Sequence, residues 1–134
     1  MAIPGVFDDQ SEVERVVLDL NQAWLEGRVD DLPAFFHEDV VMQLPRAGGR
    51  VEGREAMVES YRQFIEAADI HTFEIAKLQV DVFEGTAVAS LEFAITYELG
   101  DTIYEETGTD LTVLSLGEEG WQVVWRTQLP SSPS

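Results

Sequence analysis

Residues 87–97 read AVASLEFAITY, and one side of this stretch is entirely apolar when it is drawn as a β-strand. The alternation predicts a strand with one face toward a core. Gly100 and Asp101 then predict a hairpin turn into a long strand over 103–116. A second turn over 117–120 predicts a last strand over 121–129. This end of the chain is therefore expected to form long, hairpin-connected strands.

The preceding strand, from residue 70, has an interrupted alternation. Phe73 and Ile75 share one parity, whereas Leu78, Val80 and Val82 have the other. A change of phase near residues 76–77 predicts a β-bulge, and a bulge bends the strand that carries it. We therefore expect the sheet to be curved.

Helices are predicted before the long strands. A capping box of Ser11 and Glu14 begins an apolar stripe at helical spacing, which predicts a helix over 11–26. Asp30 is expected to cap a short second helix. Short strands at 40–44 and 51–52 precede a third helix over 54–68, which carries its own apolar stripe.

This order of elements predicts an α+β fold. We expect a cone-shaped, curved antiparallel sheet with three N-terminal helices that together enclose a pocket. The length of 134 residues fits one domain over 1–134. Its core is expected over 11–129, with flexible ends at 1–9 and 130–134.

Composition excludes several classes of function. The chain has no cysteine and only two histidines, so thiolate metal sites and a three-histidine site within one chain are excluded. The net charge of −18 disfavours nucleic-acid and anionic-membrane partners. The acidic residues are scattered, so we expect no metal site and no cofactor. The absence of a signal-like start and of long apolar runs predicts a cytoplasmic protein.

Several short motifs resemble the nuclear transport factor 2-like superfamily, and the closest similarity is to its SnoaL-like and ketosteroid isomerase branch. The motifs are AWLEGRVD at 23–30, FFHEDV at 35–40, VEGREA at 51–56 and GWQVVWR at 120–126. The resemblance covers roughly residues 11–129 and implies the fold described above. It does not identify a reaction, because this superfamily contains isomerases, dehydratases, cyclases, epoxide hydrolases and binding proteins.

The resemblance allows individual site positions to be compared. The isomerase base is an Asp before a Pro, and the matching residue here is Leu44. The oxyanion-hole Tyr of the first helix matches Leu20, whereas the other two positions match Asp110 and Tyr61. Ketosteroid-type isomerisation is therefore not expected. An epoxide hydrolase would need an Arg at Gly108.

Asp110 is the candidate catalytic residue, because Asp is disfavoured in strands and this one precedes an apolar run. Desolvation disfavours the charged form of a carboxyl group in an apolar pocket, so such a group can act as a neutral acid. The alternative is a solvated or structurally hydrogen-bonded Asp near a strand end.

The predicted function is the binding of a small apolar molecule, with Asp110 as the catalytic group of a possible cofactor-independent lyase, isomerase or cyclase. The alternatives are binding without catalysis and an interaction module whose pocket is filled by its own side chains. The predicted ligand-binding residues are Leu20, Trp24, Phe36, Met42, Leu44, Tyr61, Phe93, Ile95, Thr112, Leu114, Trp125 and Thr127.

The strands also predict an assembly. Leu111 and Val113 point away from the face that carries Asp110, and Val124 opposes Val123. A sheet face that met only water would carry polar residues. We therefore expect a homodimer formed through the outer face of the sheet.

Overall fold

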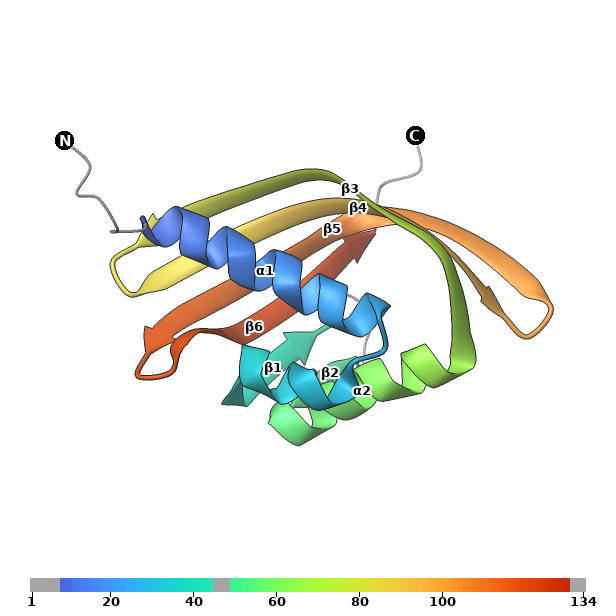
Figure 1. The fold of residues 1–134 in the computed structure, drawn as a ribbon, viewed down its shortest axis with the longest axis horizontal. Helices are drawn as coiled ribbons and strands as arrows, with labels where there is room; N and C mark the ends of the chain where they lie inside the picture. Colours follow the sequence, from blue (N-terminus) through green and yellow to red (C-terminus); the bar gives the residue numbers. More distant parts are fainter. Residues whose placement is uncertain (1–7, 45–48, 131–134) are drawn as a thin grey trace.

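The structure is a computed structural model that describes residues 8–44 and 49–130. Helices lie on one side of a long curved sheet, as Figure 1 shows. In chain order the elements are α1 (Asp9–Leu25), the 3-10 helix η1 (Val29–Phe35), β1 (Phe36–Gln43), β2 (Arg50–Glu52), α2 (Arg54–Ala67), β3 (Ala68–Phe83), β4 (Thr86–Leu99), β5 (Thr102–Gly117) and β6 (Gly120–Pro130). The predicted α+β class is confirmed.

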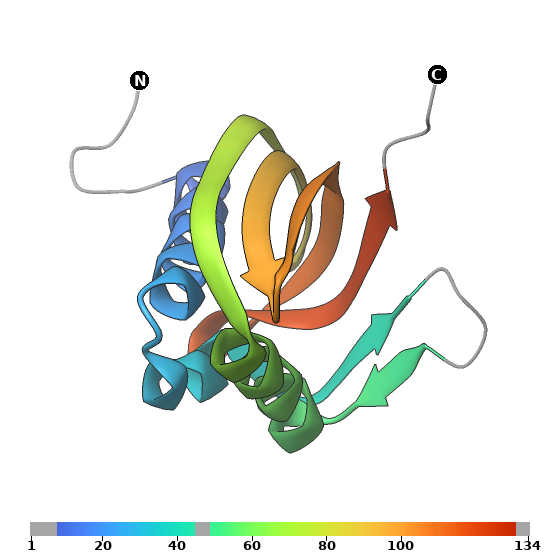
Figure 2. The same ribbon diagram turned by 90° about the vertical axis from the view of Figure 1, so that its right-hand side faces the viewer.

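The six strands form one sheet in the order β2-β1-β6-β5-β4-β3. Strand β1 runs parallel to β6, and the other neighbours are antiparallel. The prediction of an antiparallel sheet is therefore wrong for this one pair, because the chain passes through β2, α2 and the long strands β3 to β5 after β1 and returns beside it in the same direction as β6. The sheet is mixed and does not close (Figure 2).

Helix α1 begins earlier than predicted. The side chain of Asp8 caps it by accepting a hydrogen bond of 2.7 Å from the backbone N–H of Ser11. The predicted cap at Ser11 is wrong, because Asp8 already satisfies the amide at this end. The predicted apolar stripe is confirmed, since Val13, Val17 and Trp24 are buried.

The second and third predicted helices are η1 and α2, which precede β1 and β3 respectively. The predicted cap at Asp30 is wrong, since Arg28 precedes η1 and makes no capping hydrogen bond with its side chain. The fully buried Phe36, one of the predicted ligand-binding residues, is the first residue of β1. Helix α2 matches the predicted 54–68 closely, and buries Met57 and Tyr61.

Bulges curve the sheet, as predicted from the broken alternation. The register between β3 and β4 shifts between Ile75 and Lys77, where the sequence predicted it, and also between Ile70 and Thr72. A further shift lies between β5 and β6, which the sequence analysis missed. Figure 2 shows the long strands curling toward the side occupied by the helices.

The hydrophobic core lies between α1, α2 and the concave face of the sheet. Its fully buried side chains include Leu32, Met57, Leu91 and Leu114. Most of the two predicted flexible ends falls outside the described residues, whereas Asp9 is the first residue of α1 and Pro130 is the last of β6. No helix within 8–44 or 49–130 is long and apolar enough to cross a membrane.

Candidate functional site

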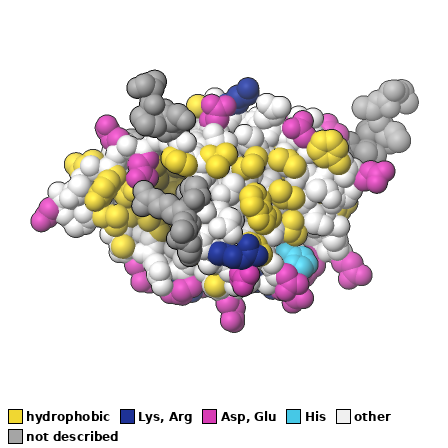
Figure 3. All heavy atoms as spheres, turned by 180° about the vertical axis from the view of Figure 1, so that it is seen from behind, with side chains coloured by type: hydrophobic (Ala, Val, Ile, Leu, Met, Phe, Trp, Pro, Cys, Tyr) yellow, Lys and Arg dark blue, Asp and Glu magenta, His cyan; other side chains and the backbone are white. Residues whose placement is uncertain are grey.

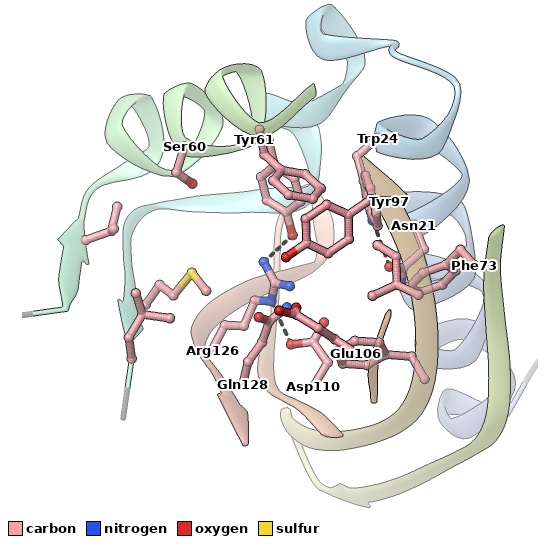
Figure 4. Close-up of a pocket in the computed structure, with 16 residues that line it drawn as sticks. Asn21, Trp24, Ser60, Tyr61, Phe73, Tyr97, Glu106, Asp110, Arg126 and Gln128 are labelled. Carbon is pink, nitrogen blue, oxygen red and sulfur yellow. Dashed lines mark hydrogen bonds and ion pairs between the residues drawn. The ribbon is translucent and has the colours of Figure 1, made fainter. Parts of the chain in front are cut away.

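A cavity of about 370 Å³ lies between α1, α2 and the concave face of the sheet (Figure 4). Its volume is within the range of small-molecule sites, ~300–1,000 Å³. The apolar and aromatic part of the wall is formed by Trp24, Met42, Leu44, Val51, Tyr61, Phe64, Phe73, Phe93, Ile95 and Tyr97. The polar part is formed by Asn21, Ser60, Glu106, Asp110, Arg126 and Gln128.

Strand β6 turns Arg126 into this cavity by means of its bulge. Leu114 pairs with Val123, whereas the next residue along β5, Val113, pairs with Trp125. Val124 is therefore one extra residue in β6, and the inward side chains after it are Arg126 and Gln128. They lie opposite Thr112 and Asp110 of β5.

Asp110, Arg126 and Tyr61 form one buried cluster. The Nε of Arg126 donates a hydrogen bond of 2.7 Å to Oδ1 of Asp110, and this contact is also a buried ion pair. The Nη1 of Arg126 donates to the hydroxyl oxygen of Tyr61. The guanidinium carbon also lies 5.2 Å from the centre of the Tyr61 ring. The arginine thus connects β5 and β6 to helix α2.

The cluster changes the acidity of its members. Burial raises the pKa of Tyr61 to about 12, although the charge of Arg126 opposes this shift. Burial alone would lower the pKa of Arg126, but the negative charge of Asp110 together with Tyr61 raises it above its ordinary value. At neutral pH the cluster therefore contains a neutral tyrosine and a charged arginine.

This arrangement corrects the prediction of a lone carboxyl group in an apolar wall. Asp110 accepts a charged hydrogen bond from Arg126, so it serves as the anionic partner of an ion pair and not as a neutral acid. Tyr61 accepts from Arg126 through its oxygen, which leaves its own proton available. The hydroxyl proton of Tyr61 can therefore donate to an oxygen atom of a bound molecule.

The aromatic part of the wall is a connected set of rings. The ring of Trp24 meets Phe73 edge to face with centroids 5.5 Å apart, and Phe73 stacks on Phe93 at 5.8 Å. The Nε1 of Trp24 donates to Oδ1 of Asn21 at 2.9 Å, and Nδ2 of Asn21 donates to the carbonyl oxygen of Val17 at 2.8 Å. These polar groups are satisfied within α1, so this region offers mainly apolar contact.

The structure places one group of the predicted site residues in the cavity wall, namely Trp24, Met42, Leu44, Tyr61, Phe93, Ile95 and Asp110. A second group is buried in the core beside the cavity and does not line it, namely Leu20, Phe36, Thr112 and Leu114. Phe36 supports the site indirectly, because its ring packs against that of Tyr61 with centroids 5.8 Å apart.

Trp125 and Thr127 lie outside the cavity wall, and their predicted inward orientation is wrong. The extra residue Val124 reverses the parity of everything that follows it in β6. Trp125 consequently pairs with Val113 on the outer side of the sheet. The hydroxyl group of Thr127 donates to the carbonyl oxygen of Gln43, which joins β6 to β1.

Several residues that line the cavity were not predicted from the sequence, namely Asn21, Val51, Ser60, Phe64, Phe73, Tyr97, Glu106, Arg126 and Gln128. Arg126 and Gln128 were hidden by the bulge. Glu106 has the same parity as Asp110 on β5, and this shared parity is the sequence signal that could have identified it.

The strands also gather Asp69, His71 and Glu98 on the surface, away from the cavity wall. The Nε2 of His71 lies 3.2 Å from Glu98 Oε1 and 3.9 Å from Asp69 Oδ2. Imidazole and carboxylate groups at such distances could hold a divalent cation. No metal site was expected from the sequence, where Glu98 is far from Asp69 and His71 and the three residues form no ligand motif.

Comparisons with known proteins agree with this geometry. The model of the SnoaL-like domain family matches residues 17–126. No curated protein sequence matches the chain.

Solved structures with the same fold are numerous, and three are representative. An NTF2-like protein from Cytophaga hutchinsonii is 18% identical, covers 93% of this chain and 100% of its own, and has a TM-score of 0.79. A ketosteroid isomerase-like protein from Erwinia carotovora atroseptica is 17% identical, with coverages of 96% and 100% and a TM-score of 0.77. An NTF2-like superfamily protein from Salmonella enterica is 15% identical, with coverages of 94% and 93% and a TM-score of 0.80.

At these identities the solved structures establish the fold alone, whereas the family model covers most of the sequence. The curved sheet, the helices over its concave face and the matched residues 17–126 lead to one assignment. This chain belongs to the SnoaL-like domain family, and its fold is that of the NTF2-like proteins to which it is similar.

Proposed function

We propose that this protein binds a small, mainly apolar molecule in the cavity between its helices and its sheet. The observation that carries this proposal is a cavity of about 370 Å³ whose wall is mostly aromatic and aliphatic, with a few convergent polar groups. Ligand sites in proteins usually combine these features. The volume also argues against a pocket filled entirely by its own side chains.

The polar groups would orient the ligand. Tyr61 has a free hydroxyl proton, and Gln128 brings an amide group to the same wall. Both can reach an oxygen atom on a bound molecule, while the rings of Trp24, Phe73 and Phe93 contact its apolar body. The ligand class that fits is therefore an apolar molecule with at least one hydrogen-bonding polar group.

Native mass spectrometry of the purified protein tests this proposal. We expect a bound molecule of a few hundred daltons that is lost in the variant Ile95→Trp, because the larger side chain would fill the cavity. Ile103→Trp is the matched control, since Ile103 is 59% exposed and lies outside the cavity wall. Equal ligand occupancy in the two variants would contradict the proposal.

A second candidate is a cofactor-independent lyase, isomerase or cyclase. It is favoured by the bond from Arg126 to the oxygen of Tyr61, because a nearby positive charge makes the tyrosine hydroxyl a better donor to a developing negative oxygen. Asp110 would hold Arg126 in place and thereby act as a positioning residue. Binding without chemistry remains the alternative.

Incubation of the recovered ligand with purified protein distinguishes these candidates. Conversion that is abolished in Asp110→Asn, with an unchanged fold by circular dichroism, supports the enzyme. A ligand that is recovered unaltered supports binding alone. Conversion that persists at the same rate in Asp110→Asn would overturn the role of Asp110.

We also propose that the chain forms a homodimer through the outer face of its sheet. Figure 3 shows hydrophobic side chains gathered on the face opposite α1, with acidic side chains toward its margin. Leu111, Val113 and Trp125 are only half-buried there. A two-fold axis would pair this patch with itself.

Sedimentation at low and high salt tests the dimer. Salt should strengthen it, because each chain has a net charge of −18 and screening reduces their repulsion. Val113→Lys should give monomers, since it places a charge in the patch. A wild-type monomer at micromolar concentration under both conditions would rule the dimer out.

A further inference from the structure

The charges of the cavity wall indicate which kind of ligand it can accept. Two carboxylates, Glu106 and Asp110, face one guanidinium, that of Arg126. Arg126 is already committed, because Nε contacts Asp110 at 2.7 Å and Nη1 donates to Tyr61. Its positive charge is therefore compensated within the cluster, and the wall as a whole retains one negative charge.

Glu106 supplies that remaining charge. Among the residues that the structure describes, no Lys, Arg or His lies within ion-pair distance of it. Its side chain is exposed at the edge of the cavity, and Figure 4 shows it reaching into the same space as Asp110 and Gln128. A carboxylate in this position can pair with a ligand cation without losing all of its solvent.

The aromatic rings of the cavity wall favour the same partner. Tyr97 lies in the wall and meets Phe64 edge to face, with centroids 5.2 Å apart, while Phe64 in turn contacts Trp24 at 6.2 Å. Aromatic faces attract cations through their quadrupoles. The net charge of −18 adds a long-range field that concentrates cations and repels anions.

We propose that the ligand is an amine that is protonated at neutral pH, with an aromatic or aliphatic body that fills the cavity and an ammonium group that pairs with Glu106. This inference rests on the proposed binding function and specifies its ligand class. A carboxylate ligand is disfavoured, because it would lie beside Glu106 and would compete with Asp110 for Arg126.

Three probes of equal size and different charge test the inference: 2-naphthylmethylamine, 2-naphthylmethanol and 2-naphthoate. In calorimetric titrations at pH 7 and low salt, we expect the amine to bind about tenfold more tightly than the carboxylate, with the alcohol between them. The preference should weaken as salt is added.

A pair of variants locates the source of the preference. Glu106→Gln should weaken amine binding about two- to fivefold, the size of an exposed ion pair, and should leave alcohol binding unchanged. Glu105→Gln is the matched control, because it removes the same charge from a neighbouring exposed residue that lies outside the cavity wall.

The outcomes separate the two proposals. Alcohol binding with no preference for the amine, or equal effects of Glu105→Gln and Glu106→Gln, would overturn the amine inference and leave the binding function standing. Failure of all three probes to bind would count against both.

Discussion

Strands β4 and β6 both contribute to the cavity wall, but they do so in different ways. Strand β4 pairs with β5 without interruption from Thr86–Ser115 to Leu99–Thr102, and its contribution to the wall is Phe93, Ile95 and Tyr97. Strand β6 is interrupted after Val123 and contributes only polar residues, Arg126 and Gln128. The regular strand provides packing, and the bulged strand provides the charged group.

The comparison shows that one inserted residue decides which of the alternating side chains of a strand face the cavity. In β4, successive side chains alternate strictly between the two faces of the sheet. In β6, Val124 is an extra residue without a partner on β5. The pair before it is Leu114 with Val123, and the pair after it is Val113 with Trp125. The chemistry of the site therefore depends on a residue that does not itself line the cavity.

Deleting one residue from each strand should give the largest difference between β4 and β6. Deletion of Glu92 forces one half of β4 to exchange faces, which moves buried side chains such as Leu91 or Ile95 outward. We expect loss of cooperative urea unfolding. Deletion of Val124 removes the extra residue and keeps every other pair, so we expect a folded protein that is about 1–2 kcal/mol less stable.

Circular dichroism and urea unfolding of the two deletion variants provide the measurement. The difference matters more than either value, because both variants lose one residue from a long strand. If the two deletion variants unfold cooperatively with similar urea midpoints, the proposed difference between the regular strand β4 and the bulged strand β6 is wrong.

The same contrast explains which parts of the fold could be predicted. The alternation of β4 and the phase change near Lys77 are written in the order of side chains, and both predictions are confirmed. The direction of β1 relative to β6 is not written in the order of side chains, because a short apolar strand can pair with β6 in either direction. Its parallel pairing follows from the path of the chain through β2, α2 and β3 to β5, which the local pattern does not contain.

The site was harder to predict for a related reason. Counting back from the paired Gly117 and Gly120 across a regular hairpin brings Trp125 opposite Thr112, which is the inward position the sequence analysis assumed. Because of the extra residue Val124, Arg126 and not Trp125 lies opposite Thr112. Val123 and Val124 are both apolar, so no change of residue type marks the bulge, and the partner of Asp110 could not be recognised.

The next prediction compares the buried ion pair of β6 with the apolar wall of β4. Arg126→Met should cost about 3–5 kcal/mol of unfolding free energy, because it leaves Asp110 buried without its partner. Ile95→Val, which removes one methyl group from the β4 wall, should cost about 0.5–1.5 kcal/mol.

A double variant, Asp110→Leu with Arg126→Met, tests the reason for the larger effect. Removing both charges also removes the uncompensated one, so most of the stability should return. Urea unfolding of the two single variants and the double variant measures this. A double variant that is as unstable as the sum of its parts would show that packing, and not charge, is responsible.

Two tyrosines, one bonded to Arg126 of β6 and the other on β4, are expected to make the stability depend on alkaline pH. Burial raises the pKa of Tyr61, which is bonded to Arg126 of β6, to about 12. Burial, reinforced by a hydrogen bond to Glu106 and by the negative charge of that residue, likewise raises the pKa of Tyr97, which lies on β4, to about 12. A tyrosine in the unfolded chain ionises near pH 10.

The sign of the pH dependence follows from these values. Below pH 10 both states hold the protons, and the stabilisation by the neutral tyrosines is fully present. Between about pH 10 and 12 the unfolded chain releases protons that the folded chain keeps, so stability falls by up to about 1.4 kcal/mol per pH unit for each tyrosine. Tyr61→Phe and Tyr97→Phe should each reduce this slope by one proton, which urea unfolding at several alkaline pH values would detect. If only Tyr97→Phe reduces it, the folded chain does not raise the pKa of Tyr61 above that of the unfolded chain, and the effect attributed to its burial is wrong.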